Sequence, residues 1–313
     1  MGNCILVSPG VLESDNSLDL LDIMGNLSYD DNNVTFLDYD AAPCHNQYCP
    51  VFQRVAPPFL AVTCAAAAVG TGVLLVALAK WPQGWCWPRS RALVAQLAVA
   101  MGLFAAVLPV VAVGAGQGWR LGGGLCRVTH LLWHWSLFAQ GLLLGSGCCC
   151  GSAWCRWDPR SRRLAVAAWA GALVLAAPAA LTSGTAAAPG MSCVRRSVDV
   201  LSPLYLLYLG LCVGLFLLLP AALLVAALAV PRLRAGAGAG GLFFGLWVPY
   251  GAGLAVDFLL RTHVLQPTCG TFERFDYALG LSEGLGVLHC CLGPAALLAA
   301  RLCRRGDGAG TSC

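Results

Sequence analysis

Seven long apolar stretches constrain the fold of this chain more than any other feature. Each is long enough to cross the hydrocarbon core of a bilayer, which takes about 20 residues in a helix. Backbone polar groups in lipid must be satisfied within the segment, so such runs predict helices. The sequence therefore predicts an all-α membrane protein with a seven-transmembrane-helix bundle, with spans at about 57–79, 91–113, 126–149, 164–184, 203–230, 241–260 and 276–300.

The composition agrees with a membrane protein. Hydrophobic residues make up 58% of the chain and charged residues 11%, whereas soluble domains carry about 25% charged residues. We therefore expect membrane lipid to surround the helices. A basic stripe with interleaved aromatic residues is missing from the sequence, so we expect no nucleic acid as partner. We also expect no cofactor and no metal, because no C-x-x-C pair meets a histidine cluster.

The charges of the short loops predict the orientation. Lys and Arg gather in cytoplasmic loops. With the N-terminus outside, twelve of the nineteen basic residues fall on the inner side, and seven fall on the outer side. The chain then has an extracellular N-terminal tail at residues 1–56, the helical domain at 57–300 and a short cytoplasmic tail at 301–313.

The N-terminal tail is strongly acidic. Eight of the fifteen acidic residues precede residue 50, and the first basic residue is Arg54. With few large apolar residues, we expect the tail to be disordered when free. Its charge would attract a basic protein partner and steer the encounter. The alternative is that these acidic residues only keep the tail soluble and have no role in binding.

Two kinds of modification motif lie in the tail. Asn26 and Asn33 begin N-x-S/T sequons, which are useful only on a surface that passes through the secretory lumen. Tyr29 and Tyr39 are candidates for sulfation because acids flank them. The predicted ligand-binding residues of the tail are these two tyrosines and their neighbours Asp30, Asp31, Asp38 and Asp40.

The cysteines divide between the two sides. Cys126 tops the third span and Cys193 lies in the next outer loop, where an oxidising exterior favours a bridge. Cys269, in the last outer loop, is within reach of Cys44 or Cys49. Cysteines near the inner face are candidates for palmitoylation, among them Cys303 and Cys313, and reduced thiols are an equal alternative.

A few polar residues fall inside the predicted spans. Asp257 and Glu283 are intramembrane acids, which are functional candidates by default. They either meet a basic ligand terminus in an outer cavity or join a polar network between helices. His130 and His134 lie one turn apart without a third metal ligand nearby, which favours interfacial packing.

The motifs resemble the rhodopsin-like G-protein-coupled receptors and, within them, the chemokine receptors. The run from Ser282 to Pro294 contains an acid followed by His-Cys-Cys-Leu-Gly-Pro, similar to the chemokine-receptor His-Cys-Cys-Leu-Asn-Pro. Trp247-Val248-Pro249 resembles the family's Trp-x-Pro kink, and Pro109 also fits. The resemblance implies a bridge between Cys44, rather than Cys49, and Cys269.

Three switch motifs of the receptor family are replaced. Met101 stands where the family has the acid of its sodium site, and Gly293-Pro294 replaces Asn-Pro in the seventh span. Cys150-Gly151-Ser152 stands where the family has Asp-Arg-Tyr. With these losses the chain is similar to the atypical chemokine receptors, which implies no productive G-protein coupling.

The resemblance also implies the ligands and the route through the cell. It implies binding of many basic inflammatory chemokines of the CC and CXC classes, which the receptor sequesters, internalises or transcytoses. The chain would lie in the cell membrane and cycle through early and recycling endosomes. Homodimers or heterodimers are left open. The alternatives are a conventional signalling chemokine receptor and, from another class, a membrane transporter or enzyme; no inverted repeat of a transporter is evident.

Overall fold

The computed structural model describes residues 49–80, 91–149, 159–186, 192–194, 203–229, 237–261, 264 and 268–307. The predicted sites of the acidic tail, up to Cys44, lie outside these ranges, as do the replaced motif at 150–152 and Cys313. For Cys269 and Cys303 the backbone is described, at the start of one helix and near the end of another.

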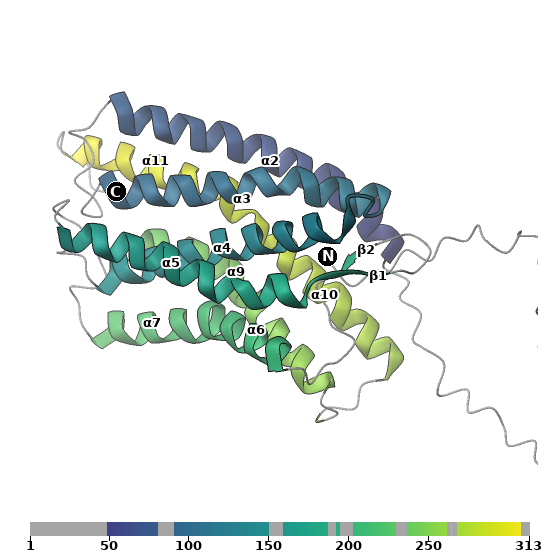
Figure 1. The fold of residues 1–313 in the computed structure, drawn as a ribbon. Helices are drawn as coiled ribbons and strands as arrows, with labels where there is room; N and C mark the ends of the chain where they lie inside the picture. Colours follow the sequence, from purple (N-terminus) through teal and green to yellow (C-terminus); the bar gives the residue numbers. More distant parts are fainter. Residues whose placement is uncertain are drawn as a thin grey trace, which may run out of the picture.

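The described chain forms a bundle of seven helical columns (Figure 1). Two columns consist of more than one segment: α6, η3 and α7 run on without a break, and α10 meets α11 at the turn residue Leu288. The segments are α2 (Cys49–Lys80), α3 (Arg91–Gln117), α4 (Gly122–Cys149), α5 (Pro159–Thr182), α6 (Pro203–Val213), π-helical η3 (Gly214–Leu218), α7 (Leu219–Ala229), α9 (Ala237–Arg261), α10 (Cys269–Val287) and α11 (His289–Asp307).

Six of the seven columns are long and apolar enough to span a membrane by length and composition. The seventh is α4, which has 28 residues and packs between α3 and α5. Polar side chains such as His130, His134 and Gln140 lower its mean hydropathy. The prediction of an all-α seven-helix membrane bundle is confirmed.

The helices extend beyond the predicted spans at both ends of the bundle. Helix α2 begins at Cys49 rather than near residue 57, so its first two turns belong to what the sequence predicted as tail. Helix α11 continues to Asp307 rather than ending near residue 300. Hydropathy marks the width of the hydrocarbon core, whereas a helix continues as long as its hydrogen bonds and packing allow.

Helix α2 shows how the bundle divides apolar residues between core and lipid. Leu60, Ala67 and Leu74 are fully buried and recur every seven residues, so they form one stripe that faces the other helices. Val62 and Val69, on the other side, are 70% and 68% exposed. Exposed valines of this kind suit a lipid surface, which explains the low content of charged residues.

A small antiparallel ribbon, which the sequence did not predict, covers one end of the bundle. Strand β1 (Gly184–Ala186) pairs with β2 (Ser192–Val194), with Cys193 opposite Thr185. A disulfide joins Cys193 to Cys126 at the start of α4. We call this end, where α2 also begins, the disulfide end (Figure 1).

The column of α6, η3 and α7 changes character along its length. In η3, Phe216 approaches α9 so closely that a Cβ on Gly251 would lie 2.9 Å from the Cβ of Phe216. A single π-helical turn shifts the side chains that follow it to a new face. Beyond it α7 has no fully buried residue: Leu219 and Leu223 are half-buried against the core, and the other side of α7 is exposed.

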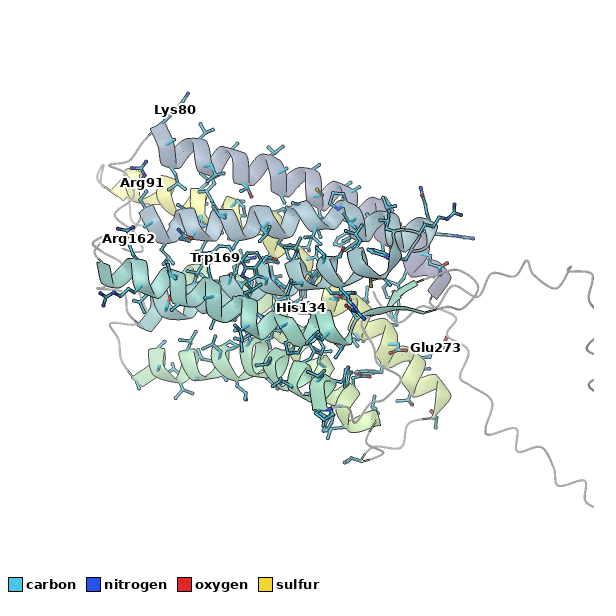
Figure 2. All side chains as sticks on the ribbon, in the orientation of Figure 1. Lys80, Arg91, His134, Arg162, Trp169 and Glu273 are labelled. Atoms are coloured by element: carbon cyan, nitrogen blue, oxygen red, sulfur yellow. A yellow bond between two sulfur atoms is a disulfide. The ribbon has the colours of Figure 1, made fainter. Side chains whose placement is uncertain are left out.

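Charged side chains mark the two ends of the bundle (Figure 2). Lys80, Arg91 and Arg162 lie exposed at the end opposite the disulfide, where α2 ends and α3 and α5 begin. Glu273, in the first turns of α10, lies at the disulfide end. Exposed basic residues also lie at the disulfide end, at Arg54, Arg120, Arg127 and Arg274, so both ends of the described bundle carry bases.

Candidate functional site

The disulfide ties the strand β2 to the start of α4. The two Cα atoms of Cys126 and Cys193 are 5.6 Å apart, and Cys126 is fully buried. The bond therefore fixes the ribbon over the disulfide end of the helices. Of the residues described below, His130, His134, Asp257 and Glu283 lie in this half of the bundle.

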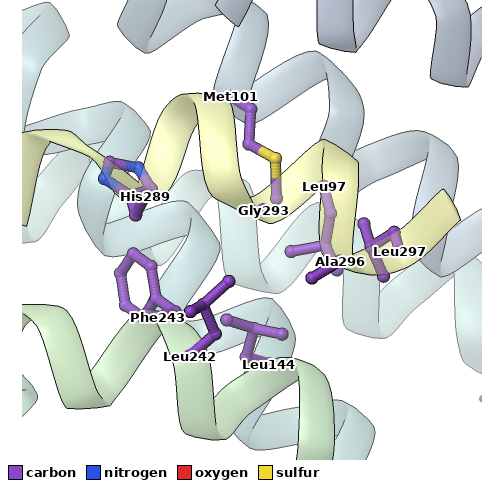
Figure 3. Close-up of a pocket in the computed structure, with 9 residues that line it drawn as sticks. All are labelled: Leu97, Met101, Leu144, Leu242, Phe243, His289, Gly293, Ala296 and Leu297. Carbon is purple, nitrogen blue, oxygen red and sulfur yellow. The ribbon is translucent and has the colours of Figure 1, made fainter. Parts of the chain in front are cut away.

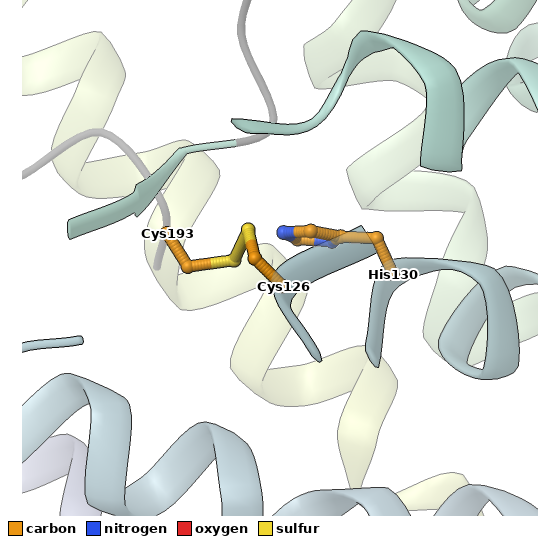
Figure 4. A group of neighbouring side chains, drawn as sticks. All are labelled: Cys126, His130 and Cys193. Atoms are coloured by element: carbon orange, nitrogen blue, oxygen red, sulfur yellow. A yellow bond between two sulfur atoms is a disulfide. The ribbon is translucent and has the colours of Figure 1, made fainter. Parts of the chain in front are cut away.

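The ring of His130 lies against this disulfide (Figure 4). Ligand atoms of Cys126, His130 and Cys193 lie within 4.8 Å of one another, which is the spacing of a metal site. Zinc binds cysteine as thiolate, and here both sulfur atoms are bonded to each other. The imidazole of His130 is therefore the single possible metal ligand that remains in this group, and the group does not form a metal centre while the disulfide is closed.

His134, one turn below His130, is buried between helices. Its Nδ1 lies 2.8 Å from the backbone oxygen of His130, and its Nε2 lies 3.3 Å from the hydroxyl of Tyr208 on α6. A nitrogen beside a carbonyl oxygen must donate, so Nδ1 carries a proton; in the neutral imidazole Nε2 then accepts from Tyr208. The predicted interfacial packing of this histidine becomes a buried polar contact between α4 and α6.

Asp257 forms the second polar contact of α6. It is 3% exposed on α9, and the hydroxyl of Tyr205 donates to its Oδ2 at 3.4 Å. Tyr205 and Tyr208 lie one turn apart with ring centroids 6.2 Å apart. The two tyrosines thus connect α6 to the carboxylate on one side and to His134 on the other.

Glu283 is a second buried carboxyl group, 7% exposed on α10. It lies deeper than Asp257. Gly286 abuts Trp247, because a Cβ there would lie 2.8 Å from the indole ring. Glu283 is three residues, about 4.5 Å of helix, above that contact, whereas Asp257 is ten residues, about 15 Å, above Trp247. The two carboxyl groups therefore lie at different depths on neighbouring helices.

Aromatic rings close the region below Glu283. Trp247 is fully buried and stacks on Phe216 with centroids 5.2 Å apart, and Phe104 meets it edge-on at 6.5 Å. Phe104 also packs on Trp133 at 4.5 Å. These contacts join α3, α4, η3 and α9 into one rigid layer beneath the polar half.

His289 lies at the bottom of this layer. Its Nδ1 is 2.7 Å from the backbone oxygen of Gly286 and 3.2 Å from the indole nitrogen of Trp247. One nitrogen cannot donate to the carbonyl and also accept from the indole. The shorter contact favours a proton on Nδ1, so the approach of Trp247 is a packing contact.

The half of the bundle opposite the disulfide is apolar where the receptor family has polar switches. Met101 fills the space beside Gly293: a Cβ on Gly293 would lie 2.9 Å from the methyl carbon and 3.1 Å from the sulfur of Met101 (Figure 3). A cavity of about 20 Å³, roughly one water molecule, is lined by Leu97, Met101, Leu144, Leu242, Phe243, His289, Gly293, Ala296 and Leu297.

The structure brings together some of the predicted site residues. Asp257, Glu283, Cys126 and Cys193 all lie in the disulfide half of the bundle. Cys269 starts α10 at the same end. The candidates that lie outside the described residues are Asn26, Tyr29, Asp30, Asp31, Asn33, Asp38, Tyr39, Asp40, Cys44 and Cys313.

Sequence reasoning did not identify Tyr205, Tyr208 or His289 as part of this region. One signal was present, because two tyrosines one turn apart in an apolar helix place two hydroxyl groups on one face. Their partners could not be read from the sequence, because they lie on α4 and α9.

No family model matches the chain. Individual relatives match it along nearly its whole length. The atypical chemokine receptor 1 of Macaca mulatta is 32% identical over 322 residues, which cover 97% of this chain and 92% of the relative. The receptor of the same name from Homo sapiens is 32% identical over 326 residues with the same coverage. That of Bos taurus is 30% identical over 286 residues, 88% of this chain and 82% of the relative. The chain therefore belongs to the family of atypical chemokine receptor 1, the Duffy antigen.

Proposed function

We propose that the chain is an atypical chemokine receptor that captures basic chemokines with its acidic tail and engages them in the disulfide half of the bundle. The observation that carries this proposal is the pair of buried carboxyl groups, Asp257 and Glu283, in the half of the bundle where the acidic tail joins α2. Intramembrane acids are costly to bury and suit a cationic ligand group. The names of the relatives supply the ligand class.

The tail supplies the first encounter. Its acids attract a basic protein over the screening length of about 8 Å at physiological salt, so they act best when clustered. Asp38, Tyr39 and Asp40 form such a cluster five residues before Cys44, within roughly 17 Å of it when extended. Sulfation of Tyr39 would add a permanent charge to this cluster. Tyr29, with Asp30 and Asp31, is farther away and contributes less.

The orientation follows from the charges. Over the whole sequence, twelve of the nineteen basic residues fall on the side of Lys80, Arg91 and Arg162, which supports a cytoplasmic location for the end opposite the disulfide. The tail, with glycans on Asn26 and Asn33, is then extracellular. A second bridge between Cys44 and Cys269, and palmitoyl groups on Cys303 and Cys313, complete this proposed arrangement in the cell membrane.

Ligand binding is not coupled to a G protein in this proposal. The contact of Met101 with Gly293 supports it, because a methionine fills the space that a polar switch would need. The chain then carries chemokines of the CC and CXC classes inward, through early and recycling endosomes, instead of signalling. Whether it does so as a homodimer or a heterodimer is a separate question.

The test is a panel of labelled CC and CXC chemokines on cells that express the chain, with nucleotide exchange on G proteins measured in parallel. We expect saturable binding of several basic chemokines, intake of the bound label and no ligand-dependent exchange. Binding that is confined to one chemokine and accompanied by exchange would instead establish a conventional signalling receptor. A lack of binding at normal surface levels would end the proposal.

A further inference from the structure

The beginning of α2 is built differently from the rest of that helix. Pro57 and Pro58 lie inside α2, two turns after its start at Cys49. Proline has no N–H, so the carbonyl groups of Gln53 and Arg54 lose their helical donors and the helix is weakened there. The first two turns, residues 49–56, therefore need contacts outside α2 to keep their direction.

Phe52 supplies such a contact. Its ring packs on Tyr277 of α10, with centroids 5.5 Å apart. The ring tip enters a notch at Gly280, where an added Cβ would lie 2.6 Å from Cζ and 3.0 Å from Cε1. Gly280 itself is buried and Phe52 half-buried. We call Phe52, Tyr277 and Gly280 the clamp.

The clamp joins the two elements that the proposed function needs to align. The acidic tail is continuous with the turns that hold Phe52. Glu283 is on α10, three residues after the glycine notch. At the weakened point of α2, Pro57 packs against α3, because its Cγ lies 3.1 Å from where a Cβ on Gly116 would be.

We propose that Phe52 and Gly280 are positioning residues that direct the tail toward the buried carboxyl groups, so that one chemokine engages both at once. The inference rests on the proposed function and adds to it a specific mechanical link. A ligand held at two linked sites dissociates slowly because each contact raises the effective concentration of the other. Loosening the clamp lowers that effective concentration without removing any charge.

The clamp therefore predicts a particular kinetic effect. Phe52→Ala and Gly280→Ala should each raise the dissociation rate of a labelled basic CXC chemokine about tenfold. The association rate should change less than twofold, because the tail charges that steer the encounter remain. Variant Gly280→Ala pushes aside only the far end of a side chain, so it should reach the cell surface normally.

Compensation and matched controls separate positioning from general damage. Phe52→Leu shortens the side chain and makes room for a methyl group, so the double variant Phe52→Leu/Gly280→Ala should dissociate more slowly than Gly280→Ala alone. Gly270→Ala, on the same helix with nothing within 4 Å of its Cβ, should be neutral. Phe59→Ala removes an equal ring from α2 beyond the prolines; it should lower the surface level but not change the dissociation rate.

The same experiment includes Asp38→Asn/Asp40→Asn, which tests the proposed function itself. If this tail variant binds more slowly while the clamp variants dissociate like wild type at normal surface levels, the clamp inference is wrong and the proposed function stands. If the tail variant associates at the wild-type rate, the tail does not capture the chemokine, and that part of the proposed function is wrong. Faster dissociation of both clamp variants with recovery in the double variant is the result that supports the inference.

Discussion

The two halves of the helical bundle hold different kinds of buried polar group. Among the described residues, buried carboxyl groups occur only in the disulfide half, whereas the other half holds neutral groups such as Gln140 and the hydrogen-bonded pair Trp169 and Gln96. The disulfide half keeps Asp257 bonded to Tyr205, His134 in contact with Tyr208, and Glu283 buried. The other half places Met101 against Gly293 beside a small cavity with mainly aliphatic walls. Polar groups in hydrocarbon are expensive, so they persist where they have a function. The contrast supports the proposed function, in which the disulfide half binds the ligand and the other half does not couple to a G protein.

The largest expected effect in this comparison comes from breaking the disulfide. Cys193→Ser frees β2 from α4 and should abolish chemokine binding, because the ribbon no longer covers the polar half. The chain-entropy estimate of about 4 kcal/mol for such a loop overstates the loss, since the membrane already confines the helices. Binding of labelled chemokine per surface receptor is the measurement.

Cys291→Ser is the matched control, because Cys291 is a half-buried free cysteine on α11. It should leave binding unchanged. If the Cys193 variant binds chemokine normally at a normal surface level, the disulfide is not required for ligand binding.

Removing one buried charge should have the next largest effect. Asp257→Asn keeps the shape of the side chain and an oxygen for Tyr205 but loses the charge. A hydrogen bond to a charged group is worth about 1.5–3 kcal/mol, so we expect chemokine affinity to fall roughly 10- to 100-fold. Equilibrium binding at fixed salt measures this loss.

Tyr205→Phe decides between the two roles that the sequence left open for Asp257. If the carboxylate meets the ligand, removing the tyrosine hydroxyl should weaken binding much less than Asp257→Asn does. If Asp257 only belongs to a polar network between helices, the two variants should be equally impaired, mainly in surface level.

The apolar half offers a smaller test of stability. Gly293→Asn places a side chain where the methyl carbon of Met101 lies, and Met101→Asp buries a charge without a partner, so each should lower the melting temperature of the purified protein. Together the two new side chains can hydrogen-bond. We expect a favourable coupling of about 1–2 kcal/mol in a double-mutant cycle.

The double variant should still fail to promote nucleotide exchange, because residues 150–152 also depart from the receptor motif. Ligand-dependent exchange by the double variant would show that the lost switch is confined to Met101 and Gly293. Additive losses of stability would show that the two positions do not interact.

The smallest expected effect lies in the tail. Tyr39→Phe should slow chemokine association about threefold at low salt and less at high salt, because it removes a site for an additional charge. Tyr29→Phe, farther from the bundle, should change the rate less. Association rates across a salt series measure both. If neither variant is slower, and Asp257→Asn alone abolishes binding, the encounter lies in the bundle and not in the tail.

The helical class was predictable because hydropathy and the backbone constraint in lipid act on every span separately. Even α4, which is not among the six columns apolar enough by length and composition, was predicted as a span. The start of α2 was not predictable. Gln53 and Arg54 lower the hydropathy there, while Phe52 holds the helix through a glycine on α10, more than two hundred residues away.

The acidic residues of the candidate site were predictable from the sequence, but their hydrogen-bond partners were not. Asp257 and Glu283 stand out because acids are rare in spans. That Asp257 meets Tyr205, and that His134 meets Tyr208, depends on how α4, α6 and α9 are rotated relative to one another. The π-helical turn η3 shifts that rotation by part of a turn, and no residue pattern in Gly214–Leu218 predicts a π-helix.

Helix α7, which has no fully buried residue, has a consequence for how freely its sequence can change. A library that randomises the exposed residues of α7 among leucine, isoleucine, valine, alanine and phenylalanine should yield mostly folded, chemokine-binding receptors. These residues are Ala221, Ala222, Leu224, Val225, Leu228 and Ala229. The same library in α3, where Leu97, Met101 and Phe104 are buried, should yield few. Divergence among natural variants should therefore concentrate on the exposed side of α7, where a residue needs only to be apolar and compatible with a helix.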